Sequence, residues 1–154
     1  MLDTMASPGS PPPEPGRVLA LDVGGRRIGV ALSDTTQRLA TPLTTLAAAP
    51  RPHALLKIAT LVAHHDVVAV VIGLPLSLDG TLGPQAQLTQ RFGTALAAQI
   101  AIPVHYEDER FTSAAAERMM IELGIRADRR RAQIDQVAAS LILQDFLDRT
   151  RGAP

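Results

Sequence analysis

The chain contains no cysteine and no tryptophan, and aromatic residues make up only 3% of its 154 residues. Without cysteine it can form no disulfide bond and no thiolate metal site, so oxygen or imidazole ligands would have to hold any metal ion. The scarcity of aromatic side chains argues against binding of single-stranded nucleic acid by base stacking. There is no apolar run long enough to span a bilayer and no signal-peptide pattern, so we expect a cytoplasmic protein without membrane association.

Lysine is almost absent too, because Lys57 is the only one among 15 basic residues. These are balanced by 15 acidic residues, and the net charge of +0 gives no global basic surface for nucleic acid. The arginines nevertheless gather in short groups, most clearly at Arg26-Arg27 and at residues 129–131. Guanidinium groups suit phosphate oxygens, although a GC-rich genome also produces many arginines.

The chain divides into a short tail and one domain. Residues 1–16 are rich in proline, glycine and serine, so we predict a disordered tail followed by a domain over residues 17–150. Strands are expected at residues 18–21, 28–32, 41–48, 67–75 and 102–107, and helices at 50–65, 84–100, 114–124 and 133–148. The first three strands form an antiparallel meander and the rest alternate with helices. This order predicts an α/β fold, a mixed five-stranded sheet with helices on both faces.

Asp22 ends the first predicted strand and stands two residues before Gly24-Gly25, which predict the turn of a β-hairpin. A carboxylate buried at a strand end is costly unless a cation or hydrogen bonds compensate its charge. The glycines allow a backbone or ligand to come close. Asp22 is therefore a candidate metal or phosphate ligand, and the alternative is an aspartate that only closes the turn.

Other carboxylates are expected near the same edge. The last strand ends in Glu107, Asp108 and Glu109, and ligands gather beyond the carboxyl ends of parallel strands. Asp135 lies beside the apolar stripe of the last helix, whereas Asp145 is roughly 15 Å further along its axis. Three convergent carboxylates suit divalent cations that catalyse phosphoryl displacement. The alternatives are a solvated strand end and, for Asp135, a charge that complements the helix dipole.

Candidate phosphate contacts flank these carboxylates. Arg26 and Arg27 lie in the hairpin, and Arg110 directly follows Glu109. The glycine-rich loop of residues 73–83 precedes a helix that begins at Pro84, and Gly83 with the helix N-terminus could accept a phosphate. A plain connecting loop and solvated arginines are the alternatives.

Four blocks of the chain resemble the YqgF/RuvX-like family: LDVGGRRIGVALSD, VIGLPLSLDGTLGPQAQ, DERFTSAAA and IDQVAASLILQDFLD, which together cover about residues 17–149. The resemblance implies a ribonuclease-H-like fold and a nuclease, described either as a pre-16S rRNA nuclease or as a Holliday junction resolvase. It places acidic site residues at Asp22, at the Asp108-Glu109 pair and at Asp135. Since strand side chains alternate, one of that pair faces the site, and we favour Glu109. Phe111 stands where the family usually has leucine.

We therefore predict a nuclease in which Asp22, Glu109 and Asp135 hold Mg²⁺ or Mn²⁺, with structured nucleic acid as the partner. Processing of the pre-16S rRNA 5′ end is favoured. A junction resolvase would need a two-fold homodimer, whereas a processing nuclease can act as a monomer. Two further alternatives are a non-catalytic RNA- or ribosome-binding module and a kinase of the hexokinase/acetate-kinase type, which would need a second such domain.

Overall fold

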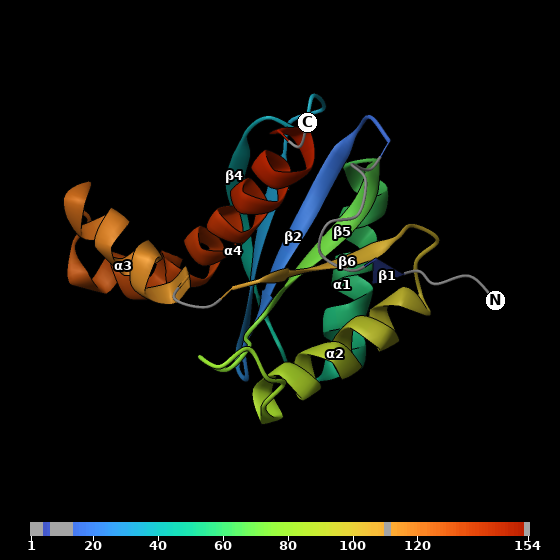
Figure 1. Ribbon diagram of the computed structural model, residues 1–154, viewed down its shortest axis with the longest axis horizontal. Helices are drawn as coiled ribbons and strands as arrows, with labels where there is room; N and C mark the ends of the chain where they lie inside the picture. Colours follow the sequence, from blue (N-terminus) through green and yellow to red (C-terminus); the bar gives the residue numbers. More distant parts are fainter. Residues whose placement is uncertain (1–4, 7–13, 110–111, 153–154) are drawn as a thin grey trace.

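The computed structural model describes residues 5–6, 14–109 and 112–152. In this part the elements are β1 (Met5–Ala6), β2 (Arg17–Val23), β3 (Arg27–Ser33), β4 (Ala40–Ala47), α1 (Arg51–His64), β5 (Val67–Leu74), α2 (Pro84–Ala97), β6 (Val104–Asp108), α3 (Thr112–Glu122) and α4 (Ala127–Gly152). Figure 1 shows a twisted sheet between helices, with the α3–α4 hairpin extending to one side. None of the helices in the described ranges is long and apolar enough to cross a membrane.

The strand order in the sheet is β1-β6-β5-β2-β3-β4. Strands β2, β3 and β4 form the predicted antiparallel meander, while β5 and β6 run parallel to β2 and are reached through α1 and α2. The five predicted strands and the α/β class are thus confirmed. The carboxyl ends of β2, β5 and β6 meet at one edge of the sheet, which is where the candidate site residues were expected.

Strand β1 was not expected. Met5 pairs with Val104 and Ala6 with His105, so a sixth strand lies parallel to β6 within the segment predicted to be disordered. The prediction is wrong for these two residues because the open edge of β6 offers backbone hydrogen bonds to any extended segment, whatever its side chains. The remaining residues of the tail up to residue 13 lie outside the described part. After them, the Gln37 side chain donates hydrogen bonds to the carbonyls of Glu14 and Gly16.

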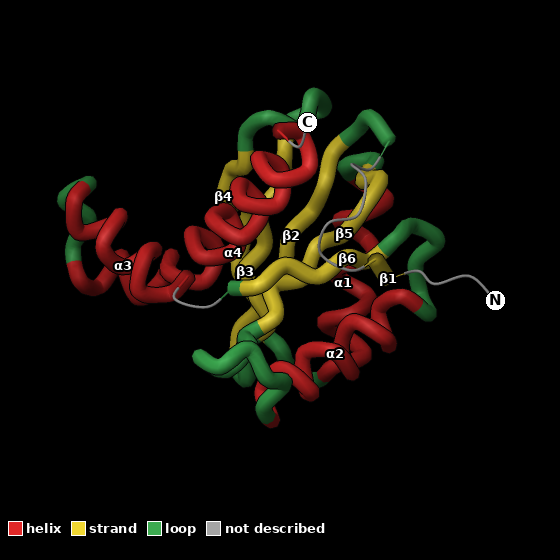
Figure 2. The backbone as a smooth tube through the Cα atoms, in the orientation of Figure 1, coloured by secondary structure: helices red, strands yellow, loops and turns green. Residues whose placement is uncertain are grey.

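Helices cover both faces of the sheet, α4 one face and α1 and α2 the other (Figure 2), and each face builds its own part of the core. On the face covered by α1 and α2, Leu21 and Ile72 pack with residues such as Leu96. On the opposite face, Ala20 and Val71 pack against α4, for example against Phe146. Consecutive residues of β2 therefore serve opposite faces, as strand geometry requires. In β2, a side chain therefore points to the α4 face when it lies an even number of residues from Ala20.

The α3–α4 hairpin closes on its own small apolar cluster, which contains Ala116, Met120, Val137 and Ala138. Gly124 lies in the connection that follows α3 and has a φ of +75°, a conformation that suits glycine. Helix α4 then begins at Ala127, six residues before the predicted start at residue 133. The early part has little apolar periodicity, but its alanine and arginine residues are good helix formers, and the helix extends through them.

Candidate functional site

Asp22 and Glu109 form a hydrogen-bonded pair of carboxyl groups at the edge of the sheet. Asp22 is in β2 and shares the parity of Ala20, so its side chain lies on the α4 face. Glu109 directly follows β6, and its backbone N–H donates to the Leu74 carbonyl at 3.2 Å, which extends the parallel pairing by one residue. The end of β5 lies between the two carboxyl groups in the sheet order.

The surroundings of this pair favour a bound proton. Burial raises the pKa of Asp22 to about 6, an effect that the hydrogen bond from Glu109 opposes and the charge of Asp135 reinforces. Burial also raises the pKa of Glu109 to about 9, with the negative charge of Asp22 as the next cause. At neutral pH the pair therefore shares one proton, with Glu109 as the donor and Asp22 as the acceptor. A metal cation could take the place of that proton.

Two glycines allow close packing at this edge, Gly29 against the backbone of α4 and Gly73 against Glu109. Gly29 lies opposite Asp22 in the β2–β3 ladder, and a Cβ atom there would lie 1.9 Å from the backbone carbonyl oxygen of Asp135 in α4. A Cβ atom on Gly73 in β5 would lie 2.5 Å from Ile142 Cδ1 and 3.0 Å from the Glu109 carboxyl carbon. The sequence prediction gave neither glycine this role, although a glycine inside a strand often marks a close backbone approach.

Asp135 lies close to the pair but its carboxylate is engaged elsewhere. Arg27 Nε donates to Asp135 Oδ2 at 2.6 Å, and the side chains are 56% and 20% exposed. The described residues contain no group of three or more carboxylate, histidine or cysteine side chains arranged to hold one ion. The fold thus brings Asp22 and Glu109 together and places Asp135 nearby. Asp135 is paired with Arg27, which was predicted to contact substrate phosphates.

The other acidic residues of this region point elsewhere. Asp108 is exposed and lies two residues after Tyr106, so its side chain points to the same face as Tyr106, opposite α4. Its negative charge nevertheless contributes to the raised pKa of Glu109. Glu107 is buried and accepts a hydrogen bond from Arg149 Nη2 at 2.6 Å. Asp145 is exposed on α4, ten residues beyond Asp135. Glu109 is therefore the residue of the predicted Asp108-Glu109 pair that faces Asp22.

The predicted phosphate contacts lie around the same edge where they are described. Arg26 is exposed in the hairpin turn, and Arg110 lies outside the described residues. Gly83 is the N-cap residue of α2 and makes no side-chain cap. The Gln85 side chain, in the first turn of α2, reaches the Val23 carbonyl at 3.5 Å, so this helix begins beside the hairpin. A cavity of about 200 Å³ separates them, lined in part by Gly24, Gly25 and Arg51.

The RuvX family model, described as Holliday junction resolvase, matches residues 16–149. The chain belongs to the RuvX family. Curated relatives support this assignment over almost the same range, and the resemblance predicted from the sequence is confirmed.

A protein of Roseiflexus sp. strain RS-1 named "Putative pre-16S rRNA nuclease" is 60% identical over 138 residues, which is 90% of this chain and 98% of that protein. A relative of the same name from Chloroflexus aurantiacus strain J-10-fl is 53% identical over 137 residues, covering 89% of this chain and 90% of the relative. Both descriptions, resolvase and rRNA nuclease, are of nucleases that hydrolyse phosphodiester bonds. This RuvX chain is thus a member of a nuclease family.

Solved structures support the fold of this RuvX chain. Thermus thermophilus RuvC in complex with a Holliday junction substrate superposes with a TM-score of 0.55 at 15% identity, covering 87% of this chain and 95% of that one. The fowlpox virus Holliday junction resolvase gives a TM-score of 0.52 at 13% identity, with coverage of 86% and 98%. At these identities the likeness establishes the shared ribonuclease-H-like fold. It does not transfer substrates or site residues.

The donor set at the edge of this RuvX chain fits a hard divalent cation. Asp22 and Glu109 supply oxygen atoms, the ligand type that Mg²⁺ and Mn²⁺ prefer. Their raised pKa values mean that two negative charges cannot coexist there without a compensating cation or proton. The missing side chain at Gly73 leaves room for the Glu109 carboxyl group, because a Cβ atom there would lie 3.0 Å from Glu109 Oε2.

Proposed function

We propose that this chain is a divalent-metal-dependent nuclease whose site is the Asp22–Glu109 edge of the sheet. The observation that carries the proposal is the hydrogen-bonded pair of half-buried carboxyl groups, held at the ends of β2 and β6 above Gly73. A structural aspartate that only closes a turn needs no second carboxyl group beside it. The pairing therefore favours a catalytic role for Asp22 over the turn-closing alternative.

In this proposal Asp22 and Glu109 hold Mg²⁺ or Mn²⁺, and Asp135 is the third ligand. When bound, the ion would activate water and compensate the negative charge that develops on the phosphodiester. Asp135 is close enough for its charge to raise the pKa of Asp22, and its ion pair with Arg27 is open to solvent on the arginine side. Arg27 would exchange this carboxylate for a substrate phosphate, which leaves the Asp135 oxygens available to a cation.

The substrate backbone would lie along the same edge. Arg26 and Arg27 in the hairpin and Arg110 after Glu109 are the proposed phosphate contacts. Gly83 and the N-terminus of α2 would bind a phosphate on the other side of the hairpin, where α2 has no side-chain cap and its first turn approaches Val23. The scarcity of aromatic residues supports recognition of backbone and shape rather than of stacked bases.

Structured RNA at the 5′ end of pre-16S rRNA is the substrate we propose, because the relatives at 53–60% identity carry that function in their name. The family description favours a second candidate, resolution of Holliday junctions. That reaction would require a homodimer that cuts two strands symmetrically, whereas rRNA processing is compatible with a monomer.

One competition experiment tests both candidates. The purified protein is given Mn²⁺ with an equimolar mixture of a pre-16S rRNA fragment and a four-way DNA junction, and its mass in solution is measured in parallel. We expect cleavage of the RNA, and Asp22→Asn should abolish it while binding is retained. Asp145→Asn is the matched control on α4. Symmetric nicks in the junction by a stable dimer, with intact RNA, would show that the protein is a resolvase. Cleavage of neither substrate would contradict the nuclease proposal.

A further inference from the structure

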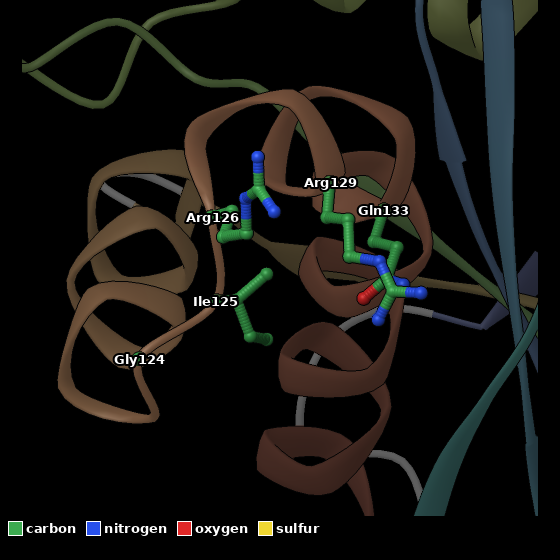
Figure 3. Close-up of a pocket in the computed structure, with 5 residues that line it drawn as sticks. All are labelled: Gly124, Ile125, Arg126, Arg129 and Gln133. Carbon is green, nitrogen blue, oxygen red and sulfur yellow. The ribbon is translucent and has the colours of Figure 1, made fainter.

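The turn between α3 and α4 contains an arginine-lined cavity that lies outside the carboxylate site. It has a volume of about 500 Å³ and is lined by Gly124, Ile125, Arg126, Arg129 and Gln133. Figure 3 shows Arg126 on the turn, Arg129 in the first part of α4 and Gln133 beside Arg129, one helical turn further on. Residues 126–131 contain four arginines and one aspartate, so this short segment is strongly basic in an otherwise neutral chain.

The cavity is built on a fixed framework. Arg130 Nη1 donates to the Ile125 carbonyl at 2.8 Å, and Arg130 Nε donates to Glu117 in α3 at 3.2 Å. Ile125 also packs against the apolar cluster of the hairpin that contains Met120 and Val137. Arg130 therefore braces the turn, while Arg126 and Arg129 are exposed at the cavity. The braced turn fixes the backbone positions from which these two side chains extend.

The lining residues select for phosphate. Two guanidinium groups and the Gln133 amide provide N–H donors, and the described lining has no carboxylate to bind a ribose hydroxyl or a cation and no aromatic ring to stack a base. Such a set recognises phosphate oxygens without reading a nucleobase. A nucleic-acid backbone meets that description better than a free nucleotide, whose base and sugar would find no partner here.

The position of the cavity fits a substrate strand that leaves the carboxylate site. Arg129 precedes Asp135 by six residues, which is roughly 9 Å along the helix axis and roughly 120° around it. A strand carries one phosphate about every 3.4 Å of duplex axis, so the cavity would be reached about three nucleotides from the site. Because the α3–α4 hairpin extends beyond the sheet, it can follow a strand away from that edge (Figure 1).

We propose that Arg126 and Arg129, with Gln133, form a second phosphate-binding site that holds the substrate backbone away from the cleaved bond. The proposal rests on the nuclease function given above and extends it to a part of the molecule outside the carboxylate edge. The ligand is a backbone phosphate of structured nucleic acid, and binding there is independent of sequence.

The test measures binding separately from cleavage by using Asp22→Asn as the background. Affinities for an RNA hairpin and for a four-way DNA junction are measured by fluorescence anisotropy at several salt concentrations. In that background Arg126→Gln/Arg129→Gln should weaken binding about a hundredfold, which is roughly tenfold for each lost charged hydrogen bond. The slope of log K against log salt should become shallower by about 1.8 for duplex regions, which corresponds to two lost phosphate contacts. Arg38→Gln/Arg91→Gln, with the same charge change at exposed positions in the β3–β4 loop and α2, should leave affinity and slope near the background values.

An unchanged slope in Arg126→Gln/Arg129→Gln, relative to the control pair, would overturn the proposal. Inorganic phosphate, tested in parallel, should bind far more weakly than the hairpin, whereas equal affinity would identify a small-anion site instead. The single variants Arg126→Gln and Arg129→Gln, each expected to produce about half of the slope change, keep the test decisive if the double variant is unstable. A failure of the nuclease proposal looks different, because the wild type would then cut neither substrate while the arginine variants still altered binding.

Discussion

Gly29 in β3 meets the backbone of Asp135 in α4 so closely that a Cβ atom on the glycine would lie 1.9 Å from the Asp135 carbonyl oxygen. This approach sets the height of α4 above the sheet at the point where β3 pairs with Asp22. The distance between Asp22 in the sheet and Asp135 in α4 therefore depends on the absence of a side chain at position 29.

Gly29→Ala should lower the free energy of unfolding by about 1–3 kcal/mol, since backbone atoms of α4 cannot move aside as a flexible side chain could. It should also reduce nuclease activity, because Asp135 would be pushed away from Asp22. Urea unfolding and a cleavage assay measure the two effects. Gly25→Ala is the matched control, because a Cβ at Gly25 meets nothing within 4 Å. Equal stability of both variants would contradict the close approach.

Gly73→Ala should displace two side chains, since its Cβ would lie 2.5 Å from Ile142 Cδ1 and 3.0 Å from Glu109 Oε2. Ile142→Val removes Cδ1, so it should cost little in the Gly73→Ala background although it typically costs about 0.5–1.5 kcal/mol alone. A double-mutant cycle on urea unfolding measures this coupling. Additive effects would show that Ile142 does not limit the space at Gly73. Metal affinity should stay impaired in the double variant, because Glu109 remains displaced.

The pH dependence of stability should reveal the Asp22–Glu109 pair. Burial raises the pKa of both groups, to about 6 and about 9, above the values of 3.8 and 4.5 that they have without the fold. The folded state then holds its protons more tightly than the unfolded state. The stabilisation by these protons is complete below about pH 4 and is lost as the pH rises through 6 and towards 9.

Without metal, Glu109→Gln should therefore be more stable than the wild type at pH 9 by more than about 1 kcal/mol, whereas the two should be similar at pH 4. Urea unfolding in EDTA at both pH values measures this difference. Addition of Mg²⁺ at pH 9 should stabilise the wild type and not the variant. A difference that does not change with pH would argue against the shared proton.

Arg27→Ala should separate binding from stability. The Arg27 side chain is 56% exposed and that of Asp135 is 20% exposed, so loss of this partly exposed ion pair should change the free energy of unfolding by no more than about 1 kcal/mol. Nucleic-acid affinity should nevertheless fall, with a salt slope shallower by about 0.9 for duplex substrates. Arg38→Ala is the control at another exposed position. A marked loss of stability with unchanged affinity would give Arg27 a structural role only.

The sequence predicted the meander, the parallel strands and the edge at which Asp22 and Glu109 meet, because apolar runs, turn glycines and side-chain alternation are local signals. Alternation also separated Glu109 from Asp108. The ion pair between Arg27 and Asp135 spans 108 residues of the chain, and such pairing depends on tertiary packing that no local pattern records. The pairing of Met5–Ala6 with β6 is a backbone interaction without a side-chain signal. The role of Gly29 became visible only once the position of α4 was known.

Helix α4 touches the sheet at Asp135 above Gly29, at Ile142 above Gly73 and at Arg149, which binds Glu107. These contacts fall at intervals of seven residues, roughly two turns, so they lie on one side of the helix and meet β3, β5 and β6 in turn. Loss or gain of one residue between positions 135 and 149 would rotate the following part by about 100° and detach it from its strands. Relatives of this chain are therefore expected to vary in length at the α3–α4 turn and to keep the interval from 135 to 149 constant.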